Sequence, residues 1–412
     1  MRILLVTPYL PHSRIGHGGG SAVRALVREL GQRHDVSLVS LLRPGDGDPQ
    51  DTARDLGVTI EAVPFLDAAA GGLSRIPLIA GRAGAALRSL VSGYPQYVTK
   101  YAHRHLLQQT IAVIEDWAPD VVQVEYLQLS LLMKGLRQWR DGREHGPRLI
   151  MDSHELGSLP RRRRAREATG FTRWLLETEA TAWDRVARDV SRWADQTLCV
   201  TDQDRQLLAS AGGQNLVTVP LGIDTDHPLI ERPDHPPFRL LFLGSFQHPP
   251  NRSAAGILCQ RIWPEVRQAL PGWKLVLAGP GSDTFLASLD APKKDVQALG
   301  FVDDLTPLFS SCSLFVAPLT EGGGIKIKIL EAMARGIPVV TTPIGAEGIT
   351  QKNEDLVWWA DEVEDFAALI TEAAGDRDAC QRRALAARAH IEQHFSWGAV
   401  VDRLEAVYRG TH

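Results

Sequence analysis

The strongest constraint on the fold is a repeated alternation between short apolar runs and longer amphipathic stretches. Strands buried on both faces, as in a parallel sheet covered by helices, read as continuous apolar runs of this kind. Between the runs, Ser21–His34 is typical: its apolar side chains recur at helical spacing, and Ser21 is the expected N-cap. Seven such runs occupy the first half of the chain, at residues 3–7, 36–41, 58–63, 121–124, 148–152, 197–200 and 216–219.

The alternation stops once and then restarts. Residues 220–238 contain five prolines, and proline at this density excludes a helix or a central strand. The sequence therefore predicts two α/β domains, 1–220 and 221–395, and a closing C-terminal helix within 396–412. In the second half the apolar runs lie at 239–244, 274–279, 295–300, 314–318, 338–342 and 356–359.

Composition excludes several classes of protein. The formal net charge is −4, so the chain lacks the overall positive charge of nucleic-acid-binding proteins. The four cysteines are far apart in sequence, which argues against zinc and dithiol sites and fits a cytoplasmic protein. The N-terminal apolar run ends at Pro8, so no signal peptide is expected. No apolar run approaches the ~20 residues that span a bilayer, so any membrane contact is expected to be peripheral.

The segment with the most chemical information lies between 318 and 331. Gly322–Gly324 follow an expected strand and precede an expected helix. Glycines allow a ligand to approach the backbone, and the start of the helix offers free N–H groups to a diphosphate. Lys326 and Lys328 add positive charge, and Glu331 shares a helix face with Lys328. A plain strand–helix loop with solvated lysines fits the same residues.

From Glu321 to Thr342 the chain contains Glu-Gly-Gly-Gly and then Lys-Ile-Leu-Glu-Ala-Met-Ala-Arg-Gly-Ile-Pro-Val-Val-Thr-Thr. This pattern resembles the donor-site signature of retaining GT-B glycosyltransferases of the group 1 type. Further resemblances follow in the family's order along nearly the whole chain. They lie at Val219–Asp224, Phe242–Asn251, Leu277–Gly281, Leu299–Val302 and Phe395–Trp397. The resemblance implies an α/β GT-B fold, in which two Rossmann-like, doubly wound parallel-sheet domains face each other across a cleft.

The resemblance also implies roles for individual residues. His154, Lys328 and Glu331 are the expected catalytic residues, and Glu125 is expected on the acceptor side. No metal site is expected, because the sequence shows no cluster of metal-ligating residues. No cofactor is expected besides the nucleoside-diphosphate sugar, which is itself the donor substrate. The expected donor-binding residues are Gly19, Gly20, Gly244, Ser245, Gly279, Gly300, Val302, Gly323, Gly324, Ile325 and Lys326.

Two departures from the family pattern change the expected chemistry. The family carries two glutamates in the donor segment, and the place of the first is taken by Gly323, with Glu321 two residues earlier. The family's arginine and lysine after the first donor-domain strand are replaced by Ser245 and the Pro249–Asn251 run. Lys326 and Lys328 are therefore the expected source of charge for the diphosphate.

Residues 161–193 admit two interpretations. The arginines at 161–164 and 166 form either a solvated face or a patch that meets anionic lipid or a lipid-diphosphate acceptor. Trp174, Leu175, Leu176 and Trp183 are expected to form the core face of a helix. The apolar, arginine-containing segment Leu73–Val91 is expected to serve as an acceptor lid or a membrane-facing helix.

The predicted function is transfer of a sugar from a nucleoside-diphosphate sugar to the hydroxyl of a carbohydrate, lipid-linked or small-molecule acceptor, with retention of anomeric configuration. Two alternatives remain open. One is a sugar-nucleotide epimerase with the same fold, and the other is a catalytically degenerate partner subunit of a glycosyltransferase complex, which the departures above would permit.

Overall fold

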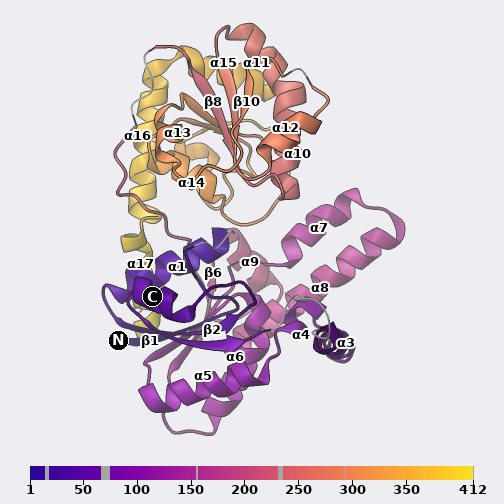
Figure 1. Cartoon of the computed structure of the whole chain (residues 1–412), viewed down its shortest axis with the longest axis vertical. Helices are drawn as coiled ribbons and strands as arrows, with labels where there is room; N and C mark the ends of the chain where they lie inside the picture. The colour runs from indigo at the N-terminus through magenta and orange to yellow at the C-terminus, as the bar shows by residue number, and fades with distance from the viewer. Residues whose placement is uncertain (14–17, 66–74, 155, 231–234, 292, 412) are drawn as a thin grey trace. The chain divides into compact units, whose positions relative to one another are not determined.

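The computed structural model describes residues 1–13, 18–65, 75–154, 156–230, 235–291 and 293–411 (Figure 1). The chain divides into two compact units. The first contains Met1–Leu221 together with Val400–His412, and the second contains Gly222–Ala399. Each unit has its own parallel sheet with helices around it.

The sheet of the first unit has the order β3-β2-β1-β4-β5-β6-β7, with every pairing parallel. The chain winds outward from β1 in one direction and then from β4 in the other. The strands are β1 Arg2–Thr7, β2 Asp35–Leu42, β3 Thr59–Pro64, β4 Val121–Glu125, β5 Arg148–Asp152, β6 Gln196–Cys199 and β7 Leu216–Thr218. The helices are α1 Gly18–Gly31, α2 Pro49–Leu56, α3 Arg75–Ser92, α4 Gln96–Lys100, α5 Arg104–Trp117, α6 Ser130–Asp141, α7 Ser158–Glu167, α8 Gly170–Trp193 and α9 Asp202–Ser210.

The sheet of the second unit repeats this winding in the order β10-β9-β8-β11-β12-β13, again all parallel. This is the strand order of dinucleotide-binding folds, with the direction of winding reversing between β8 and β11. The strands are β8 Arg239–Leu243, β9 Lys274–Ala278, β10 Val296–Ala298, β11 Leu314–Ala317, β12 Val339–Thr341 and β13 Trp358–Trp359. The helices are α10 Pro249–Ile257, α11 Trp263–Ala269, α12 Ser282–Ser288, α13 Thr306–Ser310, α14 Ile327–Ala334, α15 Asp365–Gly375, α16 Arg377–His394 and α17 Trp397–Arg409, of which α17 continues into the first unit.

The predicted fold of two parallel-sheet α/β domains is confirmed. Each apolar run identified in the sequence overlaps one of the strands above, and the inner strands of each sheet are buried on both faces. Ile3 to Val6 of β1, for example, are wholly inaccessible to solvent. Both sheets therefore need helices on both sides, as the alternation in sequence predicts.

Two local predictions are wrong. Helix α1 begins at Gly18 and not after Ser21, so the three glycines form its first turn instead of a loop. Trp174 and Leu175 do not belong to the core face of α8: they are 58% and 45% exposed, whereas Trp183 is buried. The sequence pattern did not separate these positions because both faces of the helix carry apolar side chains.

The last helix, α17, packs on the first unit. Arg33 Nη1 donates to Asp402 Oδ1 at 2.6 Å, and His34 Nε2 lies 3.1 Å from Glu405 Oε1. One face of α17 is buried, at Val400, Val401, Leu404, Val407 and Tyr408. The first unit therefore takes part of its core from the last residues of the chain.

No helix in the described part of the chain is long and apolar enough to cross a membrane.

Loss of the packing of α17 should destabilise the first unit. Leu404 is 2% exposed, and Leu404→Ala should lower the free energy of unfolding by about 2–5 kcal/mol through lost burial and a residual cavity. Urea denaturation followed by circular dichroism measures the change. Leu207 of α9 is 42% exposed, so Leu207→Ala should change the free energy by less than about 0.5 kcal/mol. Equal effects of the two substitutions would show that α17 is not part of the core.

Candidate active site

In the second unit, the loops that leave the carboxyl ends of the strands carry the predicted donor residues. Open α/β sheets bind ligands at this edge, where the winding reverses. Gly244 and Ser245 follow β8, Gly279 follows β9, and Gly300 and Val302 follow β10. The Gly323–Lys326 segment lies between β11 and α14. The structure thus brings these predicted residues to one edge of one sheet.

Glycine is required by the backbone in these loops. The N–H of Gly244 donates to Ala278 O at 3.0 Å, and the N–H of Gly279 donates to Gly300 O at 2.8 Å. Gly279 has φ +123°, and a Cβ there would lie 2.2 Å from the carbonyl oxygen of Gly244. Any other residue at position 279 would separate the loops. These glycines hold the loops together whether or not they also contact a ligand.

Lys328 lies in the first turn of α14, and its amino group is enclosed. Its Nζ donates to Asn251 Oδ1 at 2.6 Å and lies 4.6 Å from the centre of the Phe242 ring. Burial, and after it the positive charge of Lys326, lowers the pKa of Lys328 to about 7. Around neutral pH the group is therefore close to half-protonated in the free protein, and an anionic ligand would draw a proton onto it.

Lys326 is placed differently. Its Nζ donates to the carbonyl oxygen of Gly324 and lies 3.5 Å from Glu347 Oε2. A carboxylate already balances part of its charge, and its side chain is tied to the glycine loop. Lys328 is therefore the better placed of the two to respond to a bound diphosphate, while Lys326 holds the loop in position. Ile325, between Gly324 and Lys326, packs its side chain into the core, so only its backbone can contact a donor.

Glu331 follows Lys328 by one turn on α14. Burial raises the pKa of its carboxyl group, and the Arg335 guanidinium opposes that change. Within the described residues, the structure records no hydrogen bond or ion pair to the Glu331 carboxylate. A half-buried acceptor without such a partner is suited to hydroxyl groups of a ligand.

The predicted residues of the first unit meet at the ends of β4 and β5. Glu125 ends β4, Asp152 ends β5, and the two are paired in register. His154 Nε2 lies 2.6 Å from Glu125 Oε2, and the Tyr126 and His154 rings stack at 3.7 Å with 5° between their planes. Tyr126 and His154 have φ +69° and +53°, a conformation that costs energy outside glycine and recurs at functional sites.

A chain of buried hydrogen bonds supports this pair. Tyr408 OH, on α17, donates to Gln123 Oε1 at 2.6 Å, and Gln123 Nε2 donates to Glu125 Oε1 at 2.8 Å. Glu125 is wholly buried and its carboxylate contacts His154, a geometry that suits positioning of the histidine. The assignment of Glu125 to the acceptor side stays a prediction.

Three possible metal ligands also meet here, which their spacing in sequence does not indicate. Ligand atoms of Glu125, Asp152 and His154 all lie within 4.8 Å of one another. The pKa of Asp152 is raised to about 6, chiefly because the carboxyl group is buried; His154 opposes this rise and Glu125 adds to it. The backbone N–H of His154 donates to Asp152 Oδ1 at 3.0 Å. Through these hydrogen bonds, Glu125 and Asp152 hold the ring and the backbone of His154 in place.

Sequence reasoning missed the side chains that hold the candidate residues in place. Asn251 binds both Lys328 and the carbonyl oxygen of Ser245, yet the sequence pattern assigned no role to its side chain. Tyr408 could have been noticed as a tyrosine on the apolar face of the last helix, because a buried hydroxyl needs a partner. Gly19 and Gly20 lie in the first turn of α1.

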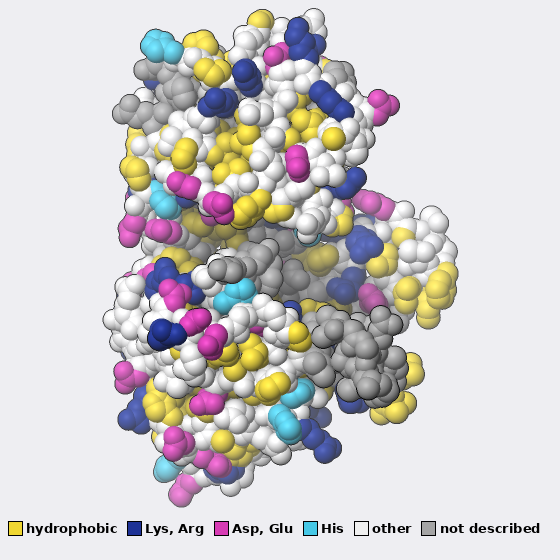
Figure 2. Space-filling view, in the orientation of Figure 1, with side chains coloured by type: hydrophobic (Ala, Val, Ile, Leu, Met, Phe, Trp, Pro, Cys, Tyr) yellow, Lys and Arg dark blue, Asp and Glu magenta, His cyan; other side chains and the backbone are white. Residues whose placement is uncertain are grey.

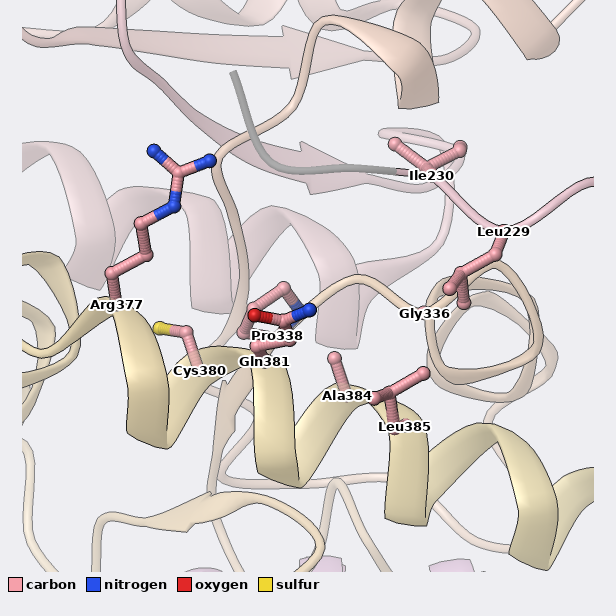
Figure 3. Close-up of a pocket in the computed structure, with 9 residues that line it drawn as sticks. All are labelled: Leu229, Ile230, Gly336, Pro338, Arg377, Cys380, Gln381, Ala384 and Leu385. Carbon is pink, nitrogen blue, oxygen red and sulfur yellow. The ribbon is translucent and has the colours of Figure 1, made fainter. Parts of the chain in front are cut away.

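A separate pocket of about 190 Å³ in the second unit contains none of the predicted residues. Figure 3 shows side chains of α16 on one side of it and Leu229 and Ile230 on the other. Described residues stop at Ile230 on that side. The pocket is lined by Leu229, Ile230, Gly336, Pro338, Arg377, Cys380, Gln381, Ala384 and Leu385.

Comparison with known families matches both halves of the chain. Residues 17–222 match the glycosyl transferase 4-like domain, and residues 237–376 match the family described as glycosyl transferases group 1. A phosphatidyl-myo-inositol mannosyltransferase of Mycobacterium tuberculosis is 25% identical over 253 residues, which are 58% of this chain and 66% of that protein. The chain thus matches slightly less than two thirds of that relative's length.

Solved structures show the same fold. Anabaena HepE in complex with UDP has a TM-score of 0.67 at 15% identity and covers 100% of both chains. Sucrose-phosphate synthase from Thermosynechococcus elongatus has a TM-score of 0.67 at 15% identity, covering 99% of this chain and 98% of that one. Together with the two parallel sheets, these likenesses confirm the predicted GT-B fold.

The hydrogen-bond chain from Tyr408 to His154 should contribute to the free energy of unfolding. Tyr408→Phe leaves the amide oxygen of buried Gln123 without its donor, which should lower the free energy of unfolding by about 1–3 kcal/mol. Tyr97 is 48% exposed, so the control Tyr97→Phe should change it by less than about 0.5 kcal/mol. Urea unfolding monitored by tyrosine and tryptophan fluorescence compares the two, and an unchanged Tyr408→Phe protein would contradict the proposed chain.

Proposed function

The chain belongs to the group 1 glycosyltransferases, and on that premise we propose that it transfers a sugar from a nucleoside-diphosphate sugar to an acceptor hydroxyl with retention. The observation that carries this proposal is the enclosed amino group of Lys328, at the start of α14 and next to the glycine loop. Charge on the diphosphate grows as the glycosidic bond breaks. A cation at this place therefore stabilises the transition state more than the bound donor.

The other residues are assigned around this step. Glu331 accepts hydrogen bonds from hydroxyl groups of the donor sugar, and the start of α14 supplies N–H groups to the diphosphate. Fixed by Glu125, His154 contacts the sugar that is transferred. The leaving diphosphate takes the proton of the acceptor hydroxyl on the same face of the sugar, so no protein nucleophile is needed. We expect no cofactor besides the donor.

The class of donor is supported by the relatives, whereas its base and sugar are left open. HepE was solved in complex with UDP, and a relative in Corynebacterium glutamicum is named as GDP-mannose-dependent. The named mannosyltransferases modify phosphatidylinositol-type acceptors, which favours a lipid-linked or carbohydrate acceptor here. A thermal-shift screen with UDP-, GDP-, dTDP- and ADP-sugars would identify the donor, because a ligand that binds the native state raises Tm.

Lys328→Ala tests the proposed mechanism. This substitution should lower kcat by roughly 10²–10³-fold, as for loss of one preorganised group that stabilises developing charge, and should change KM for the donor less. Product analysis with and without acceptor accompanies the kinetics. Epimerised donor formed without acceptor would establish the epimerase alternative, and donor binding without turnover on any acceptor would favour the inactive-partner alternative. A Lys328→Ala enzyme with near wild-type kcat would overturn the role given to Lys328.

Donor affinity should fall as pH rises above about 7. The pKa of Lys328 is lowered to about 7 in the free protein, and a bound diphosphate would raise it, so binding takes up a proton. The terminal phosphate of the nucleotide has a second pKa of about 6, so the charge of the nucleotide changes little above about pH 7. Calorimetric Kd values for a nucleoside diphosphate should rise by up to about tenfold per pH unit.

Two variants check the assignment of this pH dependence. Lys328→Met should abolish it, because the amino group that takes up the proton is removed. Lys326→Ala should move its onset to higher pH, because the charge of Lys326 is one cause of the lowered pKa of Lys328. A wild-type slope retained in Lys328→Met would assign the proton to another group.

Activity should survive removal of metal ions. The proposal gives charge stabilisation to Lys328 and the start of α14 and assigns no step to a metal. Initial rates measured before and after dialysis against EDTA should agree within error. Loss of activity that Mg²⁺ or Mn²⁺ restores would contradict this prediction. Glu125, Asp152 and His154 would then be the metal ligands to test.

A further inference from the structure

Helix α8 has apolar side chains on two separate faces. Ala180, Trp183 and Val190 lie on the face that packs into the first unit. Phe171, Trp174 and Leu175 lie on the other face, at spacings of three and four residues. At about 100° per residue, the centres of the two sets lie roughly 140° apart around the helix. One face explains how the helix joins the core, and the second face is left without a role in the fold.

The second face is exposed to solvent. Phe171 is 73% exposed, Trp174 58% and Leu175 45%, and the Phe171 and Trp174 rings stack with centroids 5.5 Å apart. These residues lie in the first turns of α8, beside the connection from α7. The α7–α8 hairpin, residues 158–179, extends away from the sheet of the first unit (Figure 1). An exposed cluster of large apolar side chains marks a docking surface.

The hairpin is also positively charged. Residues 158–179 contain six arginines and three glutamates. Arg161 pairs with Glu179, and Arg173 pairs with Glu177. Arg164 and Arg166 are exposed, and within the described residues no hydrogen bond or ion pair to their guanidinium groups is recorded. On this face of the molecule, Figure 2 shows dark-blue and yellow side chains together on the hairpin.

We propose that the tip of the α7–α8 hairpin docks on an anionic lipid bilayer, with Phe171, Trp174 and Leu175 entering the interfacial layer. Tryptophan, phenylalanine and leucine beside arginines form the combination that binds a bilayer interface: the apolar face is buried in the lipid and the basic groups meet anionic headgroups. The cluster is carried on a projecting hairpin instead of in a groove, which suits a soft, flat surface. This proposal does not depend on sugar transfer and is tested without donor or acceptor.

Vesicle co-sedimentation gives the first test. The full-length protein should bind phosphatidylcholine vesicles that contain phosphatidylglycerol, and should bind vesicles of phosphatidylcholine alone much more weakly. Added salt should weaken the binding, because exposed charges are screened. A protein that stays in the supernatant with anionic vesicles at low salt would overturn the proposal.

Paired variants locate the contact. The double substitution Phe171→Ser and Trp174→Ser should lower the partition coefficient on anionic vesicles by at least about tenfold. Arg164→Gln and Arg166→Gln should lower it by roughly fivefold for each arginine, with little effect on neutral vesicles. As a control, Leu207→Ser removes an exposed apolar side chain elsewhere in the first unit and should bind like wild type. Unchanged melting curves would show that the variants are folded, and wild-type binding by the Phe171/Trp174 variant would place the contact elsewhere.

A fluorescent label distinguishes insertion from self-association. All four cysteines are buried, so a cysteine introduced by Phe171→Cys can be labelled selectively with an environment-sensitive dye. Its emission should shift to the blue with anionic vesicles, and the same label at Leu207→Cys should not respond. Analytical ultracentrifugation without lipid should give the same mass for wild type and for the Phe171/Trp174 variant. A wild-type dimer that this variant converts to monomer would assign the cluster to a second copy of the chain and overturn the proposal.

Discussion

In each sheet, the chain adds strands first on one side of a central strand and then on the other. This strand order determines where polar side chains can come together. The interior strands are packed on both faces, so most of their side chains are apolar, and polar groups such as Glu125 are found toward the strand ends. Only the loops beyond the carboxyl ends are free to vary, and at the reversal two of them leave in opposite directions. In the second unit this edge holds the glycine loop and Lys328. In the first, Glu125 ends β4, beside the reversal, and His154 follows the adjacent β5.

Much of the fold could be read from the sequence, because a buried parallel strand leaves a continuous apolar run that few other structures produce. Patterns failed where a residue has two explanations. Ser21 fits an N-cap, but the helix already begins at Gly18, and Trp174 fits a core face as well as an exposed one. The partners in the candidate site were hidden for another reason: Asn251 and Lys328 are 77 residues apart, and Glu125 and His154 are 29 apart. Only the three-dimensional arrangement of neighbouring strands brings them together.

The choice of lysine at position 328 has chemical consequences. An arginine stays protonated at any physiological pH, whereas an enclosed lysine titrates near neutrality. Asn251 and Phe242 hold the amino group of Lys328 in both protonation states. The amide oxygen of Asn251 accepts a hydrogen bond from the amino group, and the face of the Phe242 ring attracts its positive charge when it is protonated. The proposed role of Lys328 thus assigns to one titratable group, held by an amide, the charge for which the family pattern has an arginine and a lysine.

Helix α17 makes the first unit discontinuous in sequence. The second unit is in effect an insertion, since the chain enters it after Leu221 and leaves it before Val400. Its two ends lie together, where the N–H of Ile223 donates to Phe395 O at 2.7 Å. During synthesis the second unit can therefore fold while the first still lacks a helix, in reverse of the usual order in which N-terminal domains finish first. The support that Tyr408 gives to the Glu125–His154 pair forms only once α17 has left the ribosome, so a nascent chain that stops before Val400 lacks it.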